Sequence, residues 1–395
     1  MRILFLNHNV AFTGGTFNRA LDIGHYLSTR GHEVTLLSIS KSNRWAFSEK
    51  WVRGVHLFET PDLLVGRART GWDLYDALRR AGFVAKRDWD LIHAWDCRPV
   101  VILPALVARR VSGAPLFIDW CDWWGRGGTI QERSGWVVRT FFGPVETFFE
   151  EAFRTSADRT TVISTALRER AVRLGVPRET IHLMPHGCDP VHVQPRDRAA
   201  ARARLGLPPA ISLIGSVGRL QGRDGSLMWE TVRLVVAARP ATQLVLIGDH
   251  RAQVPSDLRA GGHIIETGFV SDDELADYVA AADLMLTPLA DTIASRGRWP
   301  SKVNYYLSAG KAVVLSRVGD LPLLLEQERA ALVCAPTSAD LARGVLHLLE
   351  QPHLRAELER HARRVAETLL SWSALVDKLE LLYRAAERTS ARVRR

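Results

Sequence analysis

The fold is decided by residues 2–38, RILFLNHNVAFTGGTFNRALDIGHYLSTRGHEVTLLS. An apolar run at 3–7 is followed by a Gly-Gly loop, an amphipathic stretch and a second apolar run at 34–38. This order predicts a strand, a helix and a parallel strand, the repeating unit of doubly wound α/β sheets. Apolar residues recur at three- and four-residue spacing over 17–27, whereas Arg19 falls elsewhere on the helical wheel. One helix face is therefore expected to be buried, with Arg19 outside it.

Gly14 and Gly15 stand where this helix is expected to begin, directly after the first strand and its loop. The main-chain N–H groups and the dipole at a helix start attract anions. Ligands of open α/β sheets also bind beyond the carboxyl ends of the strands. The two glycines are thus candidates for phosphate contact, with an ordinary tight turn as the alternative.

The alternation of apolar runs and amphipathic stretches continues along the chain, with six candidate strands in each half. They are 3–7, 34–38, 91–94, 116–119, 159–163 and 181–185 in the first half, and 212–217, 244–247, 263–267, 284–287, 312–315 and 331–334 in the second. Between the halves, 189–209 is rich in Pro, Arg and Ala and has no strand-like run. The predicted fold class is α/β, with two doubly wound Rossmann-like domains. The predicted boundaries are a first domain at 1–190, a linker at 191–209, a second domain at 210–372 and a terminal helix at 373–395.

The 395 residues carry a formal net charge of +9, from 46 arginines and 6 lysines against 43 acidic residues. Genomic base composition explains such an Arg excess, and attraction to an anion such as a nucleotide diphosphate or a lipid surface is the alternative. The basic residues are dispersed and no recognition motif is present, so nucleic-acid binding is not expected.

The four cysteines show no metal-like or disulfide-like spacing, which predicts no metal site and fits a reducing cytoplasm. The apolar run near the start is too short for a signal peptide or a membrane span. We therefore expect a cytoplasmic protein that is soluble or peripheral at a membrane.

The stretch DWCDWWGRGG at 119–128 follows the fourth candidate strand and combines two carboxylates with three tryptophans. Such residues suit a sugar, because indole faces stack on apolar sugar faces and carboxylates accept hydroxyl hydrogen bonds. We expect Asp119, Trp123 and Trp124 to bind an acceptor, and Asp122 to contact the substrate or act as a general base. Core packing of the tryptophans is the alternative.

The next stretch, 134–153, is SGWVVRTFFGPVETFFEEAF. Its aromatic residues suggest an amphipathic surface element, with membrane contact through Trp136, Phe141 and Phe142. Packing beneath the preceding loop is the alternative.

The beginning of the chain, with its Gly-Gly-Thr loop, resembles the start of GT-B glycosyltransferases, in particular the large family-4 group of retaining enzymes. Seven later segments agree with that group in order and spacing. They are ADRTTVIS (157–164), IHLMPHGCD (181–189), VGRL (217–220), VLIGDH (245–250), TGFVSDDELADYVAAADLMLTPL (267–289), PSKVNYYLSAGKAVV (300–314) and LLSWSALVDKLELLYR (369–384).

The resemblance implies transfer of a sugar from a nucleoside-diphosphate sugar to an acceptor hydroxyl, with retention of configuration and without metal or cofactor. The donor would be bound mostly by the second domain. The acceptor would be bound mostly by the first domain. It would be a saccharide, a lipid-linked molecule or a small molecule. The terminal helix would cross back to the first domain.

The resemblance also assigns cations to the donor diphosphate. Arg219 matches the family's Arg, with a surface arginine at a strand end as the alternative. The family's Lys position falls at Asp224 in this chain, and Arg223 is the candidate substitute. Fixed cations in a water-poor site stabilise the charge that a leaving diphosphate gains.

A second candidate anion site is the helix that begins after Pro300, where Ser301 and Lys302 open the first turn. A simple helix cap with a solvated Lys302 is the alternative. Arg219, Lys302 and Asp122 are the candidate catalytic residues. The further donor contacts that the resemblance implies are Gly14, Gly15, Gly248, Val270, Ser301, Val303 and Tyr305.

Besides Asp224, the chain departs from the family at three further positions. Gly297 and Tyr305 stand where the family has two glutamates, and Cys121 stands near the family's sugar-contacting His. Donor identity therefore stays open. Activity does not require these residues in the proposed retaining mechanism, because the donor's own phosphate can accept the acceptor proton. The alternatives are a scaffold that binds a nucleotide sugar without turnover, and a GT-B epimerase or phosphorylase.

Overall fold

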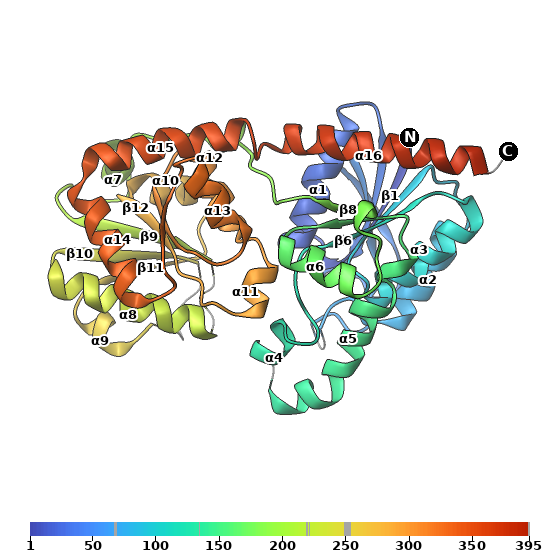
Figure 1. Cartoon of the computed structure of the whole chain (residues 1–395), viewed down its shortest axis with the longest axis horizontal. Coiled ribbons are helices and arrows are strands. Elements are labelled where there is room, and N and C mark those ends of the chain that lie inside the picture. Colours follow the sequence, from blue (N-terminus) through green and yellow to red (C-terminus); the bar gives the residue numbers. More distant parts are fainter. Residues whose placement is uncertain (67–68, 134, 219, 221, 249–253, 394–395) are drawn as a thin grey trace. The chain divides into compact units, whose positions relative to one another are not determined.

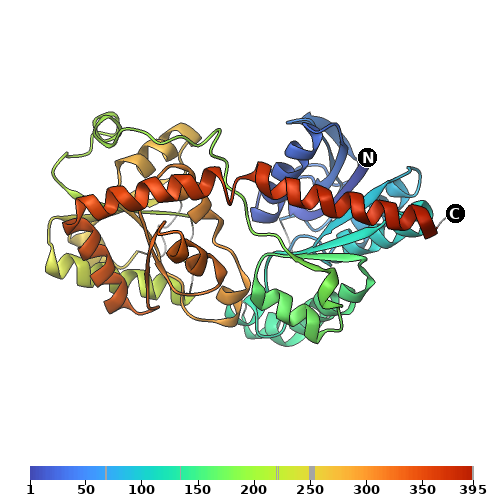
Figure 2. The same cartoon turned by 45° about the horizontal axis from the view of Figure 1, so that its top comes forward.

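The computed structural model describes residues 1–66, 69–133, 135–218, 220, 222–248 and 254–393. The chain forms two compact units, Met1–Pro185 together with Trp372–Arg395, and His186–Ser371. Each unit contains one sheet with helices packed on both of its faces (Figures 1 and 2). The predicted α/β class with two Rossmann-like domains is confirmed.

The first unit is built on an eight-stranded sheet of order β3-β4-β2-β1-β5-β6-β7-β8, parallel except for the pair β3 and β4. Its strands are β1 (Arg2–Val10), β2 (Glu33–Ile39), β3 (Ser48–Val52), β4 (Val55–Thr60), β5 (Leu91–Trp95), β6 (Leu116–Trp120), β7 (Arg159–Val162) and β8 (Ile181–Leu183). Its helices are α1 (Gly15–Ser28), α2 (Leu74–Val84), α3 (Pro99–Ser112), α4 (Thr129–Arg133), the π-helical η1 (Val138–Phe142), α5 (Gly143–Ala152), the 3-10 turns η2 (Arg154–Ser156) and η3 (Arg178–Thr180), α6 (Thr165–Arg173) and α16 (Trp372–Val393).

The prediction of six strands in the first half missed the hairpin formed by β3 and β4. Every residue of β3 from Ser48 to Trp51 is exposed, so the strand has no apolar alternation to reveal it. Arg53 and Gly54 form the two-residue turn, both with positive φ, as tight hairpins require. Pairing with β4, and not burial, creates this edge strand.

The terminal helix α16 belongs to the first unit, where it lies beside α1 (Figures 1 and 2). Its buried residues, among them Trp372 and Leu379, join one core with β1 and α1. The hydroxyl of Tyr383 lies 2.5 Å from Nδ1 of the buried His93 on β5. A helix from the end of the sequence thus completes one face of the first sheet.

The second unit has a parallel six-stranded sheet of order β11-β10-β9-β12-β13-β14. Its strands, all six of them predicted, are β9 (Ser212–Val217), β10 (Thr242–Ile247), β11 (Ile264–Gly268), β12 (Leu284–Thr287), β13 (Val313–Ser316) and β14 (Leu332–Cys334). Its helices are α7 (Arg198–Arg204), α8 (Gly222–Ala238), α9 (Ser256–Ala260), α10 (Asp272–Ala281), α11 (Ile293–Gly297), α12 (Ser301–Ser308), α13 (Asp320–Gln327), α14 (Ser338–Glu350) and α15 (Pro352–Glu367). The strands are parallel, and the inner four are largely buried, which makes their apolar runs easy to recognise, whereas the edge strands β11 and β14 are half-buried.

The segment predicted as a linker, 191–209, lies within the second unit and contains α7. The Asp197 side chain caps this helix by accepting the Ala200 N–H. Arg202 is buried and its guanidinium binds the Asp283 carboxylate at 3.0 Å. This segment is therefore part of the second unit, where α7 packs through the buried Ala201 and Arg202.

Among the helices in the described part of the chain, none combines the length and the apolar character that a membrane span requires.

Candidate functional site

The first turn of α12 in the second unit holds the predicted Lys302. Its helix is fixed to the end of β9, because the Tyr306 hydroxyl accepts the Val217 N–H at 2.8 Å. Val303 is buried, whereas Ser301 is exposed. The start of α12 is thus held at the carboxyl end of the central strand of its sheet.

Two cations and one carboxylate meet before this helix, and we call Asp224, Arg298 and Lys302 the α12 charge cluster. The Asp224 carboxylate forms an ion pair with Arg298 and accepts the Ala290 N–H at 2.8 Å. Burial, together with the Arg298 charge, lowers the pKa of Lys302 to about 8, and Asp224 opposes this shift. Lys302 makes no hydrogen bond with any residue that the structure describes. The cluster therefore holds one paired and one unpaired cation.

Arg298 is a candidate that the sequence did not reveal. Its side chain is one-fifth exposed, and its Nε is buried without a hydrogen-bond partner among the described residues. The sequence singles out Asp224 only as the residue at the family's Lys position. Only the fold shows that Asp224 is bound to an arginine 74 residues later in the sequence.

The other predicted donor residues are scattered over the second unit. Arg219 lies outside the described residues. Arg223 is exposed on the first turn of α8. Burial raises the pKa of the half-buried Tyr305 to about 12. The Gly248 N–H donates to the Gly268 carbonyl at 3.0 Å, which joins the ends of β10 and β11 two residues before Val270.

In the first unit, the predicted glycines do stand at the start of α1. Gly14 has φ of 84°, and a Cβ there would lie 2.7 Å from Nδ2 of Asn9, so only glycine fits. A Cβ built on Gly15 meets no described atom of another element within 4 Å, so position 15 has room for a side chain and position 14 does not.

Asp119 is buried at the end of β6 and has partners inside the first unit. The carboxylate accepts bonds from the Thr161 hydroxyl and the Cys121 thiol, both at 2.5 Å, and lies 3.4 Å from Arg19. Burial acts to raise the pKa of Asp119, but the charges of Arg19 and His93 and the hydrogen bonds from Cys121 and Thr161 together outweigh burial and lower the pKa. This geometry favours a positioning role over the predicted acceptor contact.

The structure corrects the expected position of Arg19, which the helical wheel places away from the buried face of α1. It is buried, and its guanidinium also donates to the carbonyl oxygens of Pro185 and Met184. A buried arginine needs several acceptors, and these come from segments distant in sequence.

Asp122, Trp123 and Trp124 are half-buried in the loop after β6. Glu150 of α5 fixes this loop, since its carboxylate accepts the N–H groups of Trp124 at 2.8 Å and Gly125 at 2.7 Å. Burial raises the pKa of Glu150. No sequence motif points to this carboxylate, because its partners lie about 25 residues away.

A second group that the sequence missed lies at the ends of β1 and β5. Asp96 adopts φ of 92°, which is rare for a residue with a side chain. Its carboxylate lies 3.4 Å from Arg154, and 3.7 Å from both His8 and Arg98. Burial lowers the pKa of His8 to about 3, so its imidazole is neutral at pH 7.

All four cysteines are free thiols, and no set of three or more His, Cys, Asp or Glu side chains in the described residues is placed to hold a metal ion.

Two family descriptions match the chain. Residues 14–187 match the "Glycosyl transferase 4-like domain", and residues 211–351 match "Glycosyl transferases group 1". Together these matches cover most of both units.

Curated relatives include the D-inositol 3-phosphate glycosyltransferase of Rhodococcus jostii, 27% identical over 60% of this chain and 54% of that protein. Another is the 2-deoxystreptamine glucosyltransferase of Streptomyces kanamyceticus, 28% identical over 68% of this chain and 70% of that protein. The chain thus spans about half the length of the inositol-phosphate relative.

Solved structures of the same fold include sucrose-phosphate synthase from Thermosynechococcus elongatus, with a TM-score of 0.75, 19% identity, and coverage of 97% of this chain and 98% of that one. HepE from Anabaena in complex with UDP-glucose gives a TM-score of 0.70 and 16% identity, covering 98% of this chain and 100% of that one. These folds, the two family matches and the two Rossmann-like units agree: the chain belongs to the family-4-like GT-B glycosyltransferases.

Proposed function

We propose that this protein transfers a sugar, such as a hexose, from a nucleoside-diphosphate sugar to an acceptor hydroxyl. The α12 charge cluster is the observation that carries the proposal. Arg298 and Lys302 converge at the start of a helix that is fixed to the end of β9, and Lys302 makes no hydrogen bond with a described residue. A diphosphate supplies the anion that such a pair of cations requires.

The chemistry follows from charge. The diphosphate gains negative charge as the glycosidic bond breaks, and Lys302, Arg298 and the predicted Arg219 would stabilise it without a metal or cofactor. Retention follows when the departing phosphate oxygen accepts the acceptor proton on the same face of the sugar. Asp122, Trp123 and Trp124 would orient the acceptor in the first unit.

HepE was solved with UDP, with UDP and glucose, and with UDP-glucose, which supports a nucleotide-sugar donor here. The acceptor is a saccharide, a lipid-linked molecule or a small molecule. The protein would act in the cytoplasm, at the cytoplasmic face of a membrane if its acceptor is lipid-linked.

The test is thermal unfolding of the full chain with a panel of UDP, ADP, GDP, dTDP and their glucose conjugates. A ligand at about 100 times its Kd adds about 2.7 kcal/mol to the free energy of unfolding. A rise in Tm with the nucleotides of one base, together with slow hydrolysis of the glucose conjugate of that base, would support transfer. NMR of the product's anomeric configuration checks retention. Failure of every nucleotide to shift Tm would contradict the proposal.

A scaffold that binds a nucleotide sugar without turnover is the alternative, kept because Gly297 and Tyr305 replace the family's glutamates. It predicts a shift in Tm with no hydrolysis and no transfer to any acceptor. Interconversion of one donor sugar into its epimer would favour the epimerase alternative.

A further inference from the structure

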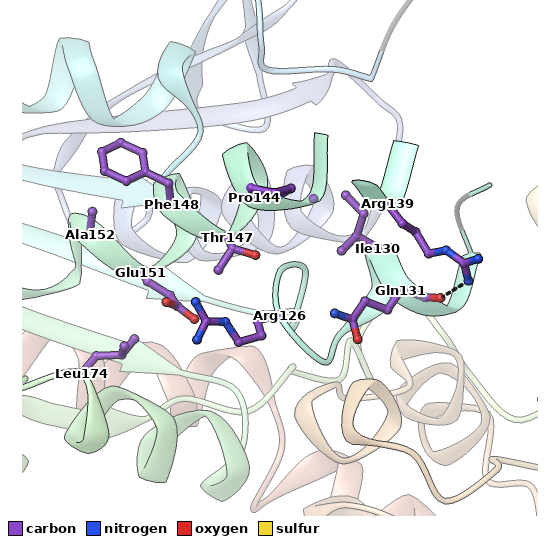
Figure 3. Close-up of a pocket in the computed structure, with 11 residues that line it drawn as sticks. Arg126, Ile130, Gln131, Arg139, Pro144, Thr147, Phe148, Glu151, Ala152 and Leu174 are labelled. Carbon is purple, nitrogen blue, oxygen red and sulfur yellow. Dashed lines mark hydrogen bonds between the residues drawn. The ribbon is translucent and has the colours of Figure 1, made fainter. Parts of the chain in front are cut away.

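The two units differ in how their cations are arranged. The first unit has a pocket of about 880 Å³, lined mainly by α4, η1 and α5, and Figure 3 shows that its arginines point apart. Arg126 is directed toward Glu151, whereas Arg139 donates to the Gln131 carbonyl oxygen at 3.2 Å. In the second unit, the cations of the α12 charge cluster instead meet at the start of one helix. Such a meeting requires contacts that hold the loop before α12 and the helix together.

The start of α12 is not held by a local cap. Its N-cap residue is Pro300, whose side chain has no hydrogen-bonding group. A contact across the helix start comes from Trp299, whose indole N–H donates to Oδ1 of Asn304 at 2.7 Å. This bond ties the residue next to Arg298 to the second turn of α12.

The other end of the Asn304 amide binds the segment through which the chain enters the second unit. Its Nδ2 donates to the His186 carbonyl oxygen at 2.6 Å and lies 3.4 Å from Sγ of Cys188. An indole N–H can only donate and a carbonyl oxygen can only accept, so the two contacts fix the orientation of the amide. The Asn304 side chain is 2% exposed, which shields both bonds from water.

The segment at 186–188 is itself paired with the place where the chain leaves this unit. The Cys188 N–H donates to the Leu370 carbonyl oxygen at 2.6 Å, and Cys188 forms a parallel bridge with Ser371. Tyr306 follows Asn304 by two residues, so it lies on a different side of the helix, where it holds α12 to β9. The helix is therefore held from two sides.

We propose that Asn304 is a positioning residue of the diphosphate site, an inference that rests on the function proposed above. Its amide keeps the loop that carries Arg298 against the start of α12, and it couples diphosphate binding to the segment at 186–188. Loss of either bond loosens the spacing of the two cations. A bound diphosphate steadies the start of α12, so the segment that Asn304 holds opens less often.

The test uses the full chain and the nucleoside diphosphate that binds it most tightly among UDP, ADP, GDP and dTDP, with Kd measured by calorimetry well below Tm. N304L fills a similar volume but removes both polar ends of the side chain, and W299F removes only the donor to Oδ1. N304L should raise the Kd by about tenfold or more, and W299F by about threefold to tenfold, as loss of two hydrogen bonds and of one predicts.

S308A is the matched control on the same helix. It removes a buried hydroxyl that donates to the Asn304 main-chain carbonyl oxygen at 2.9 Å and leaves the amide of the Asn304 side chain in place. Its Kd should stay within about twofold of the wild-type value.

Hydrogen exchange separates positioning from a purely structural role. In the wild-type chain, saturating nucleotide should slow exchange at 186–189 by about fivefold or more, as well as at 297–303. W299F should keep this protection at saturation, because the bond to His186 remains, whereas N304L should lose it at 186–189 and keep it at 297–303. A merely less stable variant would exchange faster with and without nucleotide, in the same ratio as the wild-type chain.

Two results would overturn this inference alone. One is wild-type affinity in both N304L and W299F, and the other is unchanged protection at 186–189 in N304L. If N304L does not fold, W299F decides the question of affinity against S308A. Failure of all four nucleotides to bind the wild-type chain would overturn the proposed function and this inference with it.

Discussion

At the scale of single residues, the α12 charge cluster shows how one departure from the family is compensated. Asp224 replaces a lysine, which by itself would place negative charge beside a diphosphate. The Arg298 guanidinium binds that carboxylate, so the local charge is restored by a cation from a different loop. The cluster keeps a net positive charge because Lys302 adds a second cation.

Removal of Arg298 should weaken diphosphate binding. R298A is expected to raise the Kd of whichever nucleoside diphosphate stabilises the wild-type chain by about tenfold to hundredfold, the value of a charge-assisted bond. Isothermal titration calorimetry measures it. R296A is the control, because Arg296 lies in the same segment but is exposed and paired with Asp291.

The double variant D224K/R298A makes this test specific. It restores a lysine at the family's position while Arg298 is absent, so it should recover most of the affinity that R298A loses. D224A/R298A separates the two roles: if Arg298 acts only by neutralising Asp224, this variant should recover affinity as well as D224K/R298A does, because both remove the carboxylate.

The pKa of Lys302 predicts that affinity for the diphosphate depends on pH. Its pKa of about 8 means that the free protein loses this positive charge as the pH rises above about 8. Affinity for the diphosphate should therefore fall between about pH 8 and pH 10, where the phosphates are already fully ionised. K302R stays charged throughout and should show a flat profile. A wild-type profile that is equally flat would remove Lys302 from the site.

At the scale of elements, α16 is a part of the first unit supplied by the far end of the chain. Leu379 is buried against the core of β1 and α1, whereas Leu381 on the same helix is 69% exposed. The helix is therefore required for the stability of the first unit.

This difference gives a matched pair of variants. L379A should lower the free energy of unfolding by about 2–5 kcal/mol, because it leaves a cavity in the core. L381A should change it by less than about 0.5 kcal/mol. Urea unfolding followed by circular dichroism measures both, and similar effects of the two variants would show that α16 is not packed as described.

At the scale of the whole molecule, the two units should respond differently to a donor nucleotide. Hydrogen exchange of the full chain with saturating nucleoside diphosphate should show protection at 297–303 in the second unit. Protection at 14–17 would support the predicted contacts of Gly14 and Gly15. If protection is confined to the first unit, the α12 charge cluster is not the diphosphate site.

The sequence alone determined the architecture. Short apolar runs revealed every strand of the second sheet, most clearly the inner strands, which are largely buried because helices cover both faces of the sheet. Position 14 requires glycine, since its positive φ and its contact with Asn9 exclude a side chain, whereas the predicted phosphate contact of Gly14 stays a prediction. The ordered motifs identified the family, which the comparisons confirm.

Only the tertiary structure decided which charges meet. Arg19 with Asp119, Glu150 with the tryptophan loop, and Asp224 with Arg298 are each separated by about 25 to 100 residues in sequence. The exposed strand β3 was likewise invisible until it paired with β4. The periodic spacing of apolar residues indicates which face of a helix or strand is buried, because buried positions repeat along one element. Ion pairs between elements leave no such repeat, so their partners are fixed only when the chain folds.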